Sequence, residues 1–258
     1  MSAAAQGNYY ETDRAVAEYL LFHYGEPGQI APPDFALAAA GSFPARCISE
    51  CLDPSRLPPR ASALDLGCAV GRATFEMARH CQSVLGIDWS ERFITIGKHL
   101  RKNGSFLFGC VDEGDLTHPC QAVVPAEIDR LRIRFERGDA MDLPESLRDF
   151  DVVLMANLID RLRDPRRCLE RLPALVKPGG QLIITSPYTW MTEYTPKKNW
   201  LGGFEQRGKR HRTLDALKQL LAPEFQFQRA KEIPFLIREH ARKFQLGVAE
   251  ASVWIRQE

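Results

Sequence analysis

The feature that most constrains this chain is an alternation of short apolar runs with helix-like segments between residues 61 and 187. The run DVVLM at 151–155 has the composition of a strand that is buried on both faces of a sheet. Segments with apolar residues at helical spacing follow most of these runs. This order is typical of βαβ units, so we predict an α/β fold with a mostly parallel sheet and helices on both of its faces.

The proline-rich stretch 54–59 divides the chain into two expected parts. Residues 1–60 are expected to form a helical lid segment with helices at 10–24 and 45–52, and residues 61–258 the main domain. Expected strands are 63–66, 83–87, 131–135, 151–155, 182–185, 224–230 and 247–255, the last two forming an antiparallel pair that completes seven strands. Expected helices are 72–80, 90–102, 165–176 and 213–221, and KPGG at 177–180 is expected to end the third of them.

Two segments interrupt this rhythm. An insertion at 104–130, before the third strand, is too long for an ordinary connection. Residues 188–212 are aromatic and basic and show no clean period. Long irregular segments in compact domains are often functional, with disordered loops as the alternative. We therefore take 188–212 as the candidate substrate loop.

Composition excludes several classes of protein. Lys and Arg number 34 and Asp and Glu 33, a net charge of +1, which disfavours general binding to nucleic acid. No apolar run approaches about eighteen residues, and the first residues lack a basic region, so neither a membrane span nor a secretory signal is expected. The 7 cysteines include no CxxC pair and HExxH is absent, so we expect reduced thiols, a cytoplasmic location and no metal. Cys110 and Cys120 are expected to pair only under oxidation.

A glycine turn, DLGCAVG at 65–71, links the first strand of the main domain to its helix. Gly67 and Gly71 permit a tight turn and a close approach of backbone to ligand, and the helix N-terminus adds free N–H groups. The spacing is GxxxG rather than GxGxxG, so a nucleoside with an amino-acid tail fits better than a pyrophosphate. Asp65 and Cys68 belong to this candidate site. The alternative is a turn that serves packing alone.

Acidic residues follow the next two strands. Asp88 comes about twenty residues after the turn, where a carboxylate accepts ribose hydroxyls, and Trp89 offers an apolar surface for adenine. The alternative for Asp88 is a cap on the helix that begins at Ser90. Asp139, with Ala140 beside it, follows the third strand and can accept a hydrogen bond from the adenine amine.

Polar residues also follow the fourth strand, at the edge where open α/β sheets bind ligands. Asn157 is a candidate for positioning both cofactor and acceptor, and Arg161 is a candidate partner for an anionic group. The alternatives are that Asn157 caps a helix and that Arg161 pairs with Asp160.

The ordered set DLGCAVGR, GIDWS, GDAMDLP, FDVVLMANLIDRL and LVKPGGQLIITSP resembles the class I S-adenosylmethionine-dependent methyltransferases over residues 61–187. The resemblance implies a Rossmann-like fold with S-adenosylmethionine as cofactor. It also implies that Asp65, Gly67 and Gly71 border the methionine portion, Asp88 the ribose, and Asp139 with Ala140 the adenine. One departure is visible, because Ala69 replaces the middle glycine of the family's GxGxG.

Nearly the whole chain resembles the methyltransferases of ovothiol biosynthesis. The resemblance rests on NYYETDRAVAEYLLFHYG near the start, EGDLT in the insertion, and SPYTWMTEYTPKKNWLGGF after the fifth strand. In bifunctional members this module follows an iron-dependent 5-histidylcysteine sulfoxide synthase. The resemblance implies methylation of an imidazole nitrogen of 5-thiohistidine, and a free-standing enzyme that pairs functionally with a separate synthase.

Candidate acceptor contacts lie outside the cofactor motifs. Aromatic side chains are expected to wall the imidazole, with packing as the alternative, and cationic ones to pair with the carboxylate, with a solvated basic face as the alternative. They are Tyr9, Tyr10, Tyr188, Trp190, Tyr194, Trp200, Lys197, Lys198 and Arg161, of which Tyr188 is also a positioning candidate. Other readings of the chain are a methyltransferase for another small heteroaromatic or quinone-type acceptor, and a catalytically silent cofactor-binding protein. A nicotinamide-dependent oxidoreductase is disfavoured because GxGxxG is missing.

Overall fold

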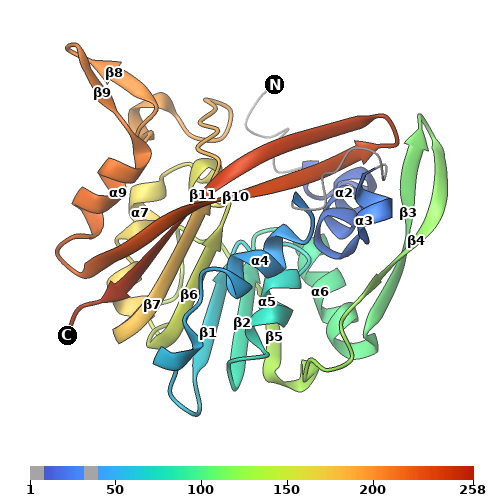
Figure 1. Ribbon diagram of the computed structural model, residues 1–258, viewed down its shortest axis with the longest axis horizontal. Helices are drawn as coiled ribbons and strands as arrows, with labels where there is room; N and C mark the ends of the chain where they lie inside the picture. Colours follow the sequence, from blue (N-terminus) through green and yellow to red (C-terminus); the bar gives the residue numbers. More distant parts are fainter. Residues whose placement is uncertain (1–8, 32–39) are drawn as a thin grey trace.

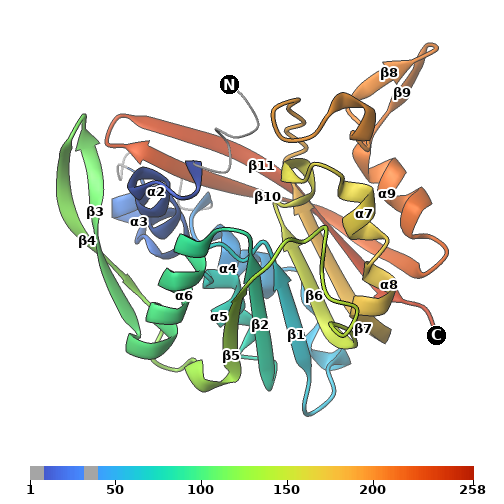
Figure 2. The same ribbon diagram turned by 180° about the vertical axis from the view of Figure 1, so that it is seen from behind.

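The computed structural model describes residues 9–31 and 40–258, and in this part seven strands form one sheet in the order β10-β11-β7-β6-β1-β2-β5 (Figures 1 and 2). The five strands from β7 to β5 are parallel, whereas β11 runs antiparallel to both β7 and β10. The strands are β1 (Ser62–Leu66), β2 (Ser83–Asp88), β5 (Ile133–Arg137), β6 (Phe150–Ala156), β7 (Val176–Ser186), β10 (Phe225–His240) and β11 (Lys243–Arg256). The predicted mostly parallel, seven-stranded sheet is confirmed.

Helices cover both faces of this sheet, as predicted. On β6, Val152 packs with α4 (Phe43–Ser49), α5 (Arg72–Met77) and α6 (Glu91–Asn103), while its neighbour Val153 packs with α7 (Pro165–Leu169), α8 (Leu172–Leu175) and α9 (Thr213–Leu221). Successive side chains of a strand point to opposite faces, so a continuous apolar run supplies both cores. None of the helices in the described residues is long and apolar enough to cross a bilayer.

The order of the strands creates a crevice at their carboxyl ends. The chain proceeds from β1 to β2 and β5 on one side, then returns to place β6 and β7 on the other side of β1. Loops that leave β1 and β6 therefore diverge, which opens the space where sheets of this kind bind ligands.

The N-terminal segment packs beside this crevice. It contains α2 (Asp13–Tyr24), α3 (Pro27–Ile30), α4 and the 3₁₀ turn η3 (Pro54–Arg56). Thr12 caps α2 by accepting a hydrogen bond from the Ala15 amide at 3.2 Å. Residues 1–8 and 32–39 of the expected lid segment lie outside the described residues.

The insertion folds as a β-hairpin of β3 (Ser105–Glu113) and β4 (Leu116–Val123) that stands at the side of the molecule (Figure 1). Cys110 and Cys120 form a disulfide across it, which corrects the expectation of reduced thiols for this pair. The strand register places their Cα atoms 6.0 Å apart, within the range of a disulfide. The ring of His118 lies within 4.8 Å of both sulfurs, but bonded sulfurs offer no thiolate to a metal.

Several predicted boundaries were wrong. Residues 165–175 form two short helices, because Pro173 has no N–H to continue the first. The strand β7 already begins at Val176, so KPGG at 177–180 belongs to that strand and does not end a helix. Residues 188–212 contain the turn η6 (Lys197–Asn199) and a small hairpin of β8 (Phe204–Gln206) and β9 (Lys209–His211). The final strands extend well beyond 224–230 and 247–255, and their hairpin crosses over α2 (Figure 1).

Candidate cofactor and acceptor site

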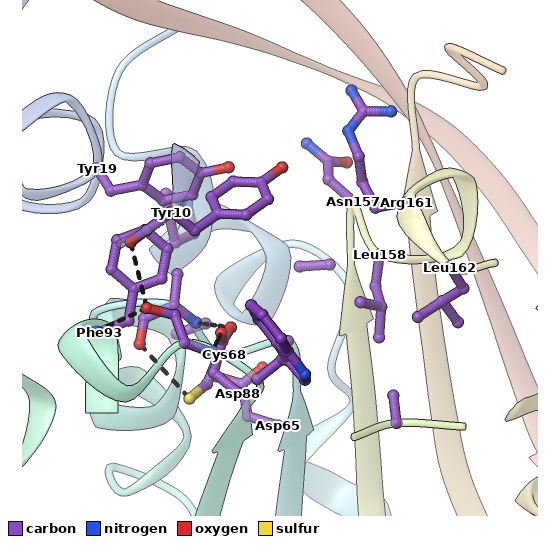
Figure 3. Close-up of a pocket in the computed structure, with 18 of the residues that line it drawn as sticks. Tyr10, Tyr19, Asp65, Cys68, Asp88, Phe93, Asn157, Leu158, Arg161 and Leu162 are labelled. Carbon is purple, nitrogen blue, oxygen red and sulfur yellow. Dashed lines mark hydrogen bonds between the residues drawn. The ribbon is translucent and has the colours of Figure 1, made fainter. Parts of the chain in front are cut away.

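A cavity of about 730 Å³ lies at the carboxyl ends of the parallel strands. The loops after β1, β2, β5 and β6 form one part of its wall. Tyr10, α2, the segment 187–194 and the β10–β11 hairpin form the rest. Figure 3 shows acidic side chains at one end and Asn157 and Arg161 at the other. The volume suits a cofactor together with a small second molecule.

The glycine turn forms the floor of this cavity. Gly67 has φ of 74°, and a Cβ there would lie 2.9 Å from Leu158 Cδ1, so this position favours glycine. Ala69 adopts φ of 46° without being glycine. Gly71 does not line the cavity. A Cβ at this position would lie 2.5 Å from the Phe135 ring. Gly71 therefore shapes the turn instead of bordering a ligand.

Asp65 has an oxygen that the described residues leave without a partner. Thr74 Oγ1 donates to Asp65 Oδ2 at 2.7 Å, whereas Oδ1 is buried and accepts no hydrogen bond. Burial raises the pKa of this carboxyl to about 7. An ammonium group placed at Oδ1 would satisfy the oxygen and restore its charge. The amino-acid tail of S-adenosylmethionine carries such a group, so the unpartnered oxygen of Asp65 fits this cofactor.

Asp88 lies at the end of β2 and lines the cavity. Its Oδ2 accepts the Ala69 amide and its Oδ1 the Ser90 amide, both at 2.9 Å. The N-cap of α6 is Ser90, whose hydroxyl accepts the Phe93 amide. Asp88 is therefore not needed as the cap of this helix. Each carboxylate oxygen retains a lone pair for a ribose hydroxyl. Burial raises the pKa of Asp88, an effect that the two amides oppose.

The adenine candidates lie beside it. Asp139 and Ala140 line the cavity after β5, and Asp139 Oδ1 accepts the Met141 amide at 2.8 Å. Trp89 is 47% exposed and also lines the cavity, with the Arg137 guanidinium 5.8 Å from its ring. Cys68 is buried on the cavity floor. These residues meet because adjacent parallel strands end at one edge.

The opposite end of the cavity carries Asn157 and Arg161. Asn157 has φ of 50° and does not cap the turn η5 (Ile159–Arg161), whose N-cap is Leu158. Its side-chain Oδ1 accepts a hydrogen bond from Thr185 Oγ1 at 3.1 Å, and its side-chain Nδ2 has no partner among the described residues. This nitrogen is therefore available to donate to a ligand.

Arg161 is held by one edge of its guanidinium. Nη1 donates to Asp160 Oδ2 at 2.8 Å and to the Thr189 carbonyl at 3.1 Å, and the group lies 4.7 Å from the Tyr194 ring centre. Nε and Nη2 donate to no group in the described part of the chain. The pairing with Asp160, which was the alternative to a ligand role, is thus present, and it leaves the other edge of the guanidinium for a ligand.

Tyr10 and Tyr19 face this guanidinium across the cavity (Figure 3). Burial raises the pKa of both phenols, and the positive charge of Arg161 acts against that rise. Both remain neutral donors at physiological pH. Together with Asn157 and Arg161 they make a polar end to an otherwise aromatic space.

Six expected acceptor contacts lie outside the cavity. Tyr9 donates to Glu18 at 2.5 Å, Tyr188 to Glu250 at 2.8 Å, and Trp190 Nε1 to Thr213 Oγ1 at 2.9 Å. Trp200 Nε1 donates to the Thr195 carbonyl at 2.8 Å, and Lys197 lies 5.8 Å from its ring centre. Lys198 does not line the cavity either. The aromatic side chains among them form hydrogen bonds within the protein, as their packing alternative predicts, whereas both lysines are exposed.

Sequence reasoning missed part of the wall. Tyr19, His23 and Phe22 enter from α2, Phe43 from α4, and Phe235, Ile237 and Gln245 from the final hairpin. The helical spacing of Tyr19 and His23 was a usable signal. The hairpin residues had none, because their strands were expected to be much shorter.

Comparison with known proteins agrees with this geometry. Residues 64–184 match the methyltransferase domain family. The chain is 27% identical over 123 residues to the ubiquinone biosynthesis O-methyltransferase of Coxiella burnetii, a match covering 48% of this chain and 42% of that protein. It is 28% identical over 185 residues to the norajmaline N-methyltransferase of Rauvolfia serpentina, covering 67% and 54%. The chain thus spans about half the length of these relatives.

The fold has close counterparts among solved structures. A putative S-adenosylmethionine-dependent methyltransferase from Listeria monocytogenes superposes with a TM-score of 0.53 at 20% identity, over 84% of this chain and 99% of that one. The glycine turn, the acids after β2 and β5, and the unpartnered oxygen of Asp65 occupy one cavity of that fold. Residues 64–184 therefore match a methyltransferase domain model, the fold is that of S-adenosylmethionine-dependent methyltransferases, and the match and the cavity both support S-adenosylmethionine as the cofactor.

Proposed function

We propose that this protein is an N-methyltransferase that methylates an imidazole nitrogen of 5-thiohistidine in ovothiol biosynthesis, in the cytoplasm and in functional partnership with a separate sulfoxide synthase. The observation that carries the proposal is the free edge of Arg161 inside the cofactor cavity. A bidentate guanidinium at that place suits the carboxylate of an amino-acid acceptor. The resemblance of the N-terminal and 186–204 segments to ovothiol methyltransferases supports the same acceptor.

The bound sulfonium cofactor supplies an activated methyl group, so the chain has to orient the acceptor and keep water away. Arg161 would hold the acceptor carboxylate, and Tyr10, Tyr19 and Asn157 would donate to its other polar atoms. Phe22, Phe43 and Phe235 provide an aromatic wall that excludes water. Positioning is thus the main contribution expected from these residues.

No general base is required for this reaction. A neutral imidazole nitrogen attacks with its own lone pair, and the ring proton leaves to water afterwards. His23 is the histidine that lines the cavity in the described residues, and burial lowers its pKa to about 3. It therefore does not take up a proton near neutrality.

A second candidate is a methyltransferase for another small heteroaromatic or quinone-type acceptor. The aromatic residues opposite the cofactor end favour a flat apolar ring. One matched relative is named for ubiquinone biosynthesis. This candidate makes no use of the cation at Arg161, which distinguishes it from the first.

The test is a turnover assay with purified protein and S-adenosylmethionine, read by mass spectrometry. The acceptors are 5-thiohistidine, histidine, and 5-thioimidazole, which keeps the ring and lacks the amino-acid group. We expect one added methyl on 5-thiohistidine and little product from the other two. Product from 5-thioimidazole at an equal rate would contradict the role of Arg161. Tight cofactor binding without any product would discard the acceptor.

A further inference from the structure

His23 occupies an unusual position between the N-terminal helix and the glycine turn. It lies in the last turn of α2 and is 7% exposed. Its Nδ1 accepts the backbone N–H of Arg72, the first residue of α5, at 3.3 Å. An imidazole that accepts through Nδ1 carries its proton on Nε2. His23 lines the cavity, and Nε2 donates to no group among the described residues.

The adjacent turn has few amides left for an anion. The amides of Gly67 and Cys68 donate to the Ile87 carbonyl, at 2.8 and 3.1 Å. Ala69 donates to Asp88 at 2.9 Å and Gly71 to the Cys68 carbonyl at 2.9 Å. The Arg72 amide is the one that His23 accepts. These five amides therefore bond within the protein and do not form a nest for a carboxylate.

Among the described residues, no cationic side chain lines the cavity beside the glycine turn. Of the described residues, Arg161 and Arg163 are the cations that line it, and both follow β6. The guanidinium of Arg72 pairs with Glu76 at 2.7 Å and does not line the cavity. A carboxylate at the glycine turn has to find a neutral donor.

The cofactor brings a carboxylate to this place. Its ammonium fits Asp65 Oδ1, and its carboxylate is attached to the same carbon as that ammonium. Asp65 is tied to α5 through Thr74, and His23 is tied to α5 through Arg72. The first turn of α5 thus holds both an acceptor for the ammonium and a donor for the carboxylate.

We propose that His23 binds the α-carboxylate of S-adenosylmethionine through its Nε2–H, as a neutral donor whose tautomer is fixed by the Arg72 amide. This inference rests on the cofactor and not on the identity of the acceptor. It assigns α2 a direct part in cofactor recognition, in addition to covering the cavity.

Calorimetric binding of two ligands tests the assignment. S-Adenosylhomocysteine carries the amino-acid group, and 5′-methylthioadenosine lacks it. We expect His23→Leu to weaken binding of S-adenosylhomocysteine about tenfold and that of 5′-methylthioadenosine less than about twofold. His23→Gln, which can accept from Arg72 and still donate, should restore most of the lost affinity.

A matched control separates contact from support. Tyr24 donates to the Val70 carbonyl at 3.0 Å, so it also ties α2 to the glycine turn. Tyr24→Phe should therefore affect both ligands alike. If His23→Leu lowers the two affinities equally, as Tyr24→Phe does, His23 only supports the turn and the proposal is overturned. Unchanged affinity for S-adenosylhomocysteine in folded His23→Leu protein would also overturn it, whatever the acceptor assay shows.

Discussion

The two ends of the cavity are built in different ways. At the cofactor end, Asp65, Asp88 and Asp139 lie within two residues of the carboxyl end of a strand, and their oxygens accept hydrogen bonds from the chain itself. At the acceptor end, the wall comes from α2, the loop after β6, residues 187–194 and the final hairpin. There Asn157 and Arg161 keep donors without partners in the described residues.

This difference indicates where specificity resides. The carboxylates of the cofactor end come from one stretch of chain, residues 65–140, and their places are tied to the strands of the sheet. A site assembled from four distant segments can be altered by substitutions at any of them without loss of the sheet. Cofactor binding and acceptor choice should therefore respond to separate sets of substitutions.

The largest expected effect is at Arg161. Arg161→Ala should lower kcat/KM for the acceptor by about a hundredfold or more, the scale of losing a charged hydrogen-bond partner in a desolvated site. The affinity for S-adenosylhomocysteine should stay within about twofold. Steady-state kinetics and calorimetry on the same preparation measure both. Arg163→Ala is the control, because Arg163 also lines the cavity and lies two residues further along the chain. A parallel loss of cofactor affinity would contradict the separation of the two ends.

A smaller effect is expected at Asp88. Asp88→Ala should weaken binding of S-adenosylhomocysteine by about 1–3 kcal/mol, because the ribose hydroxyls lose their acceptor. 5′-Methylthioadenosine has the same ribose, so its affinity should fall equally. Asp142→Ala, at a carboxylate that is 77% exposed and pairs with Arg167, should change neither. Unchanged affinity in folded Asp88→Ala protein would remove this residue from the site.

The same difference explains which parts of the site were predictable. Asp65, Asp88 and Asp139 were found because each lies within two residues of the carboxyl end of its strand, so local sequence determines their place. Phe235 and Ile237 were missed because they lie beyond residue 230, where β10 was expected to end. That strand continues because β11 pairs with it, a long-range partnership that no local pattern reveals.

The aromatic residues show most clearly which contacts the sequence could not predict. Tyr194 lines the cavity, whereas Trp190, four positions earlier, is 9% exposed and packs in the core. Both occur in one polar and aromatic segment, and an aromatic side chain is equally suited to a core and to a binding wall. Their separation depends on how 188–212 folds around Thr213 and Thr195. Composition therefore identified the segment but not its contacts.

The pH dependence of cofactor binding should distinguish the ends further. Burial raises the pKa of Asp65 to about 7, so the free protein protonates this carboxyl as the pH falls below that value. The ammonium of the ligand favours the ionised form of Asp65. Below pH 7 the affinity for S-adenosylhomocysteine should therefore fall by up to about tenfold per pH unit, and above pH 7 it should level off. Calorimetry from pH 5.5 to 7.5 measures this.

Two comparisons isolate the contribution of Asp65. 5′-Methylthioadenosine has no ammonium, and Asp65→Asn has no titrating group, so the dependence should be lost with either. A raised pKa in the folded state also means that Asp65 contributes stability below its unfolded pKa, which is lost as the pH rises through about 7. Thermal unfolding of the ligand-free protein should therefore shift in the opposite direction to ligand affinity. Equal pH profiles for the two ligands would exclude Asp65 as the partner of the ammonium.

The smallest effect on the reaction is expected at Trp190, although the sequence suggested it as a wall of the acceptor site. Its Nε1 donates to Thr213 Oγ1 inside the core, so Trp190→Phe should lower the free energy of unfolding by about 1–3 kcal/mol through the lost hydrogen bond and smaller ring. The acceptor KM should remain within about twofold, because the side chain does not reach the cavity. Tyr194→Phe, which lines the cavity beside Arg161, should give the reverse pattern of little lost stability and a raised acceptor KM. Denaturant unfolding and steady-state kinetics on these two variants measure both effects. A raised acceptor KM in Trp190→Phe would mean that the acceptor end extends past Arg161 into the segment 188–212.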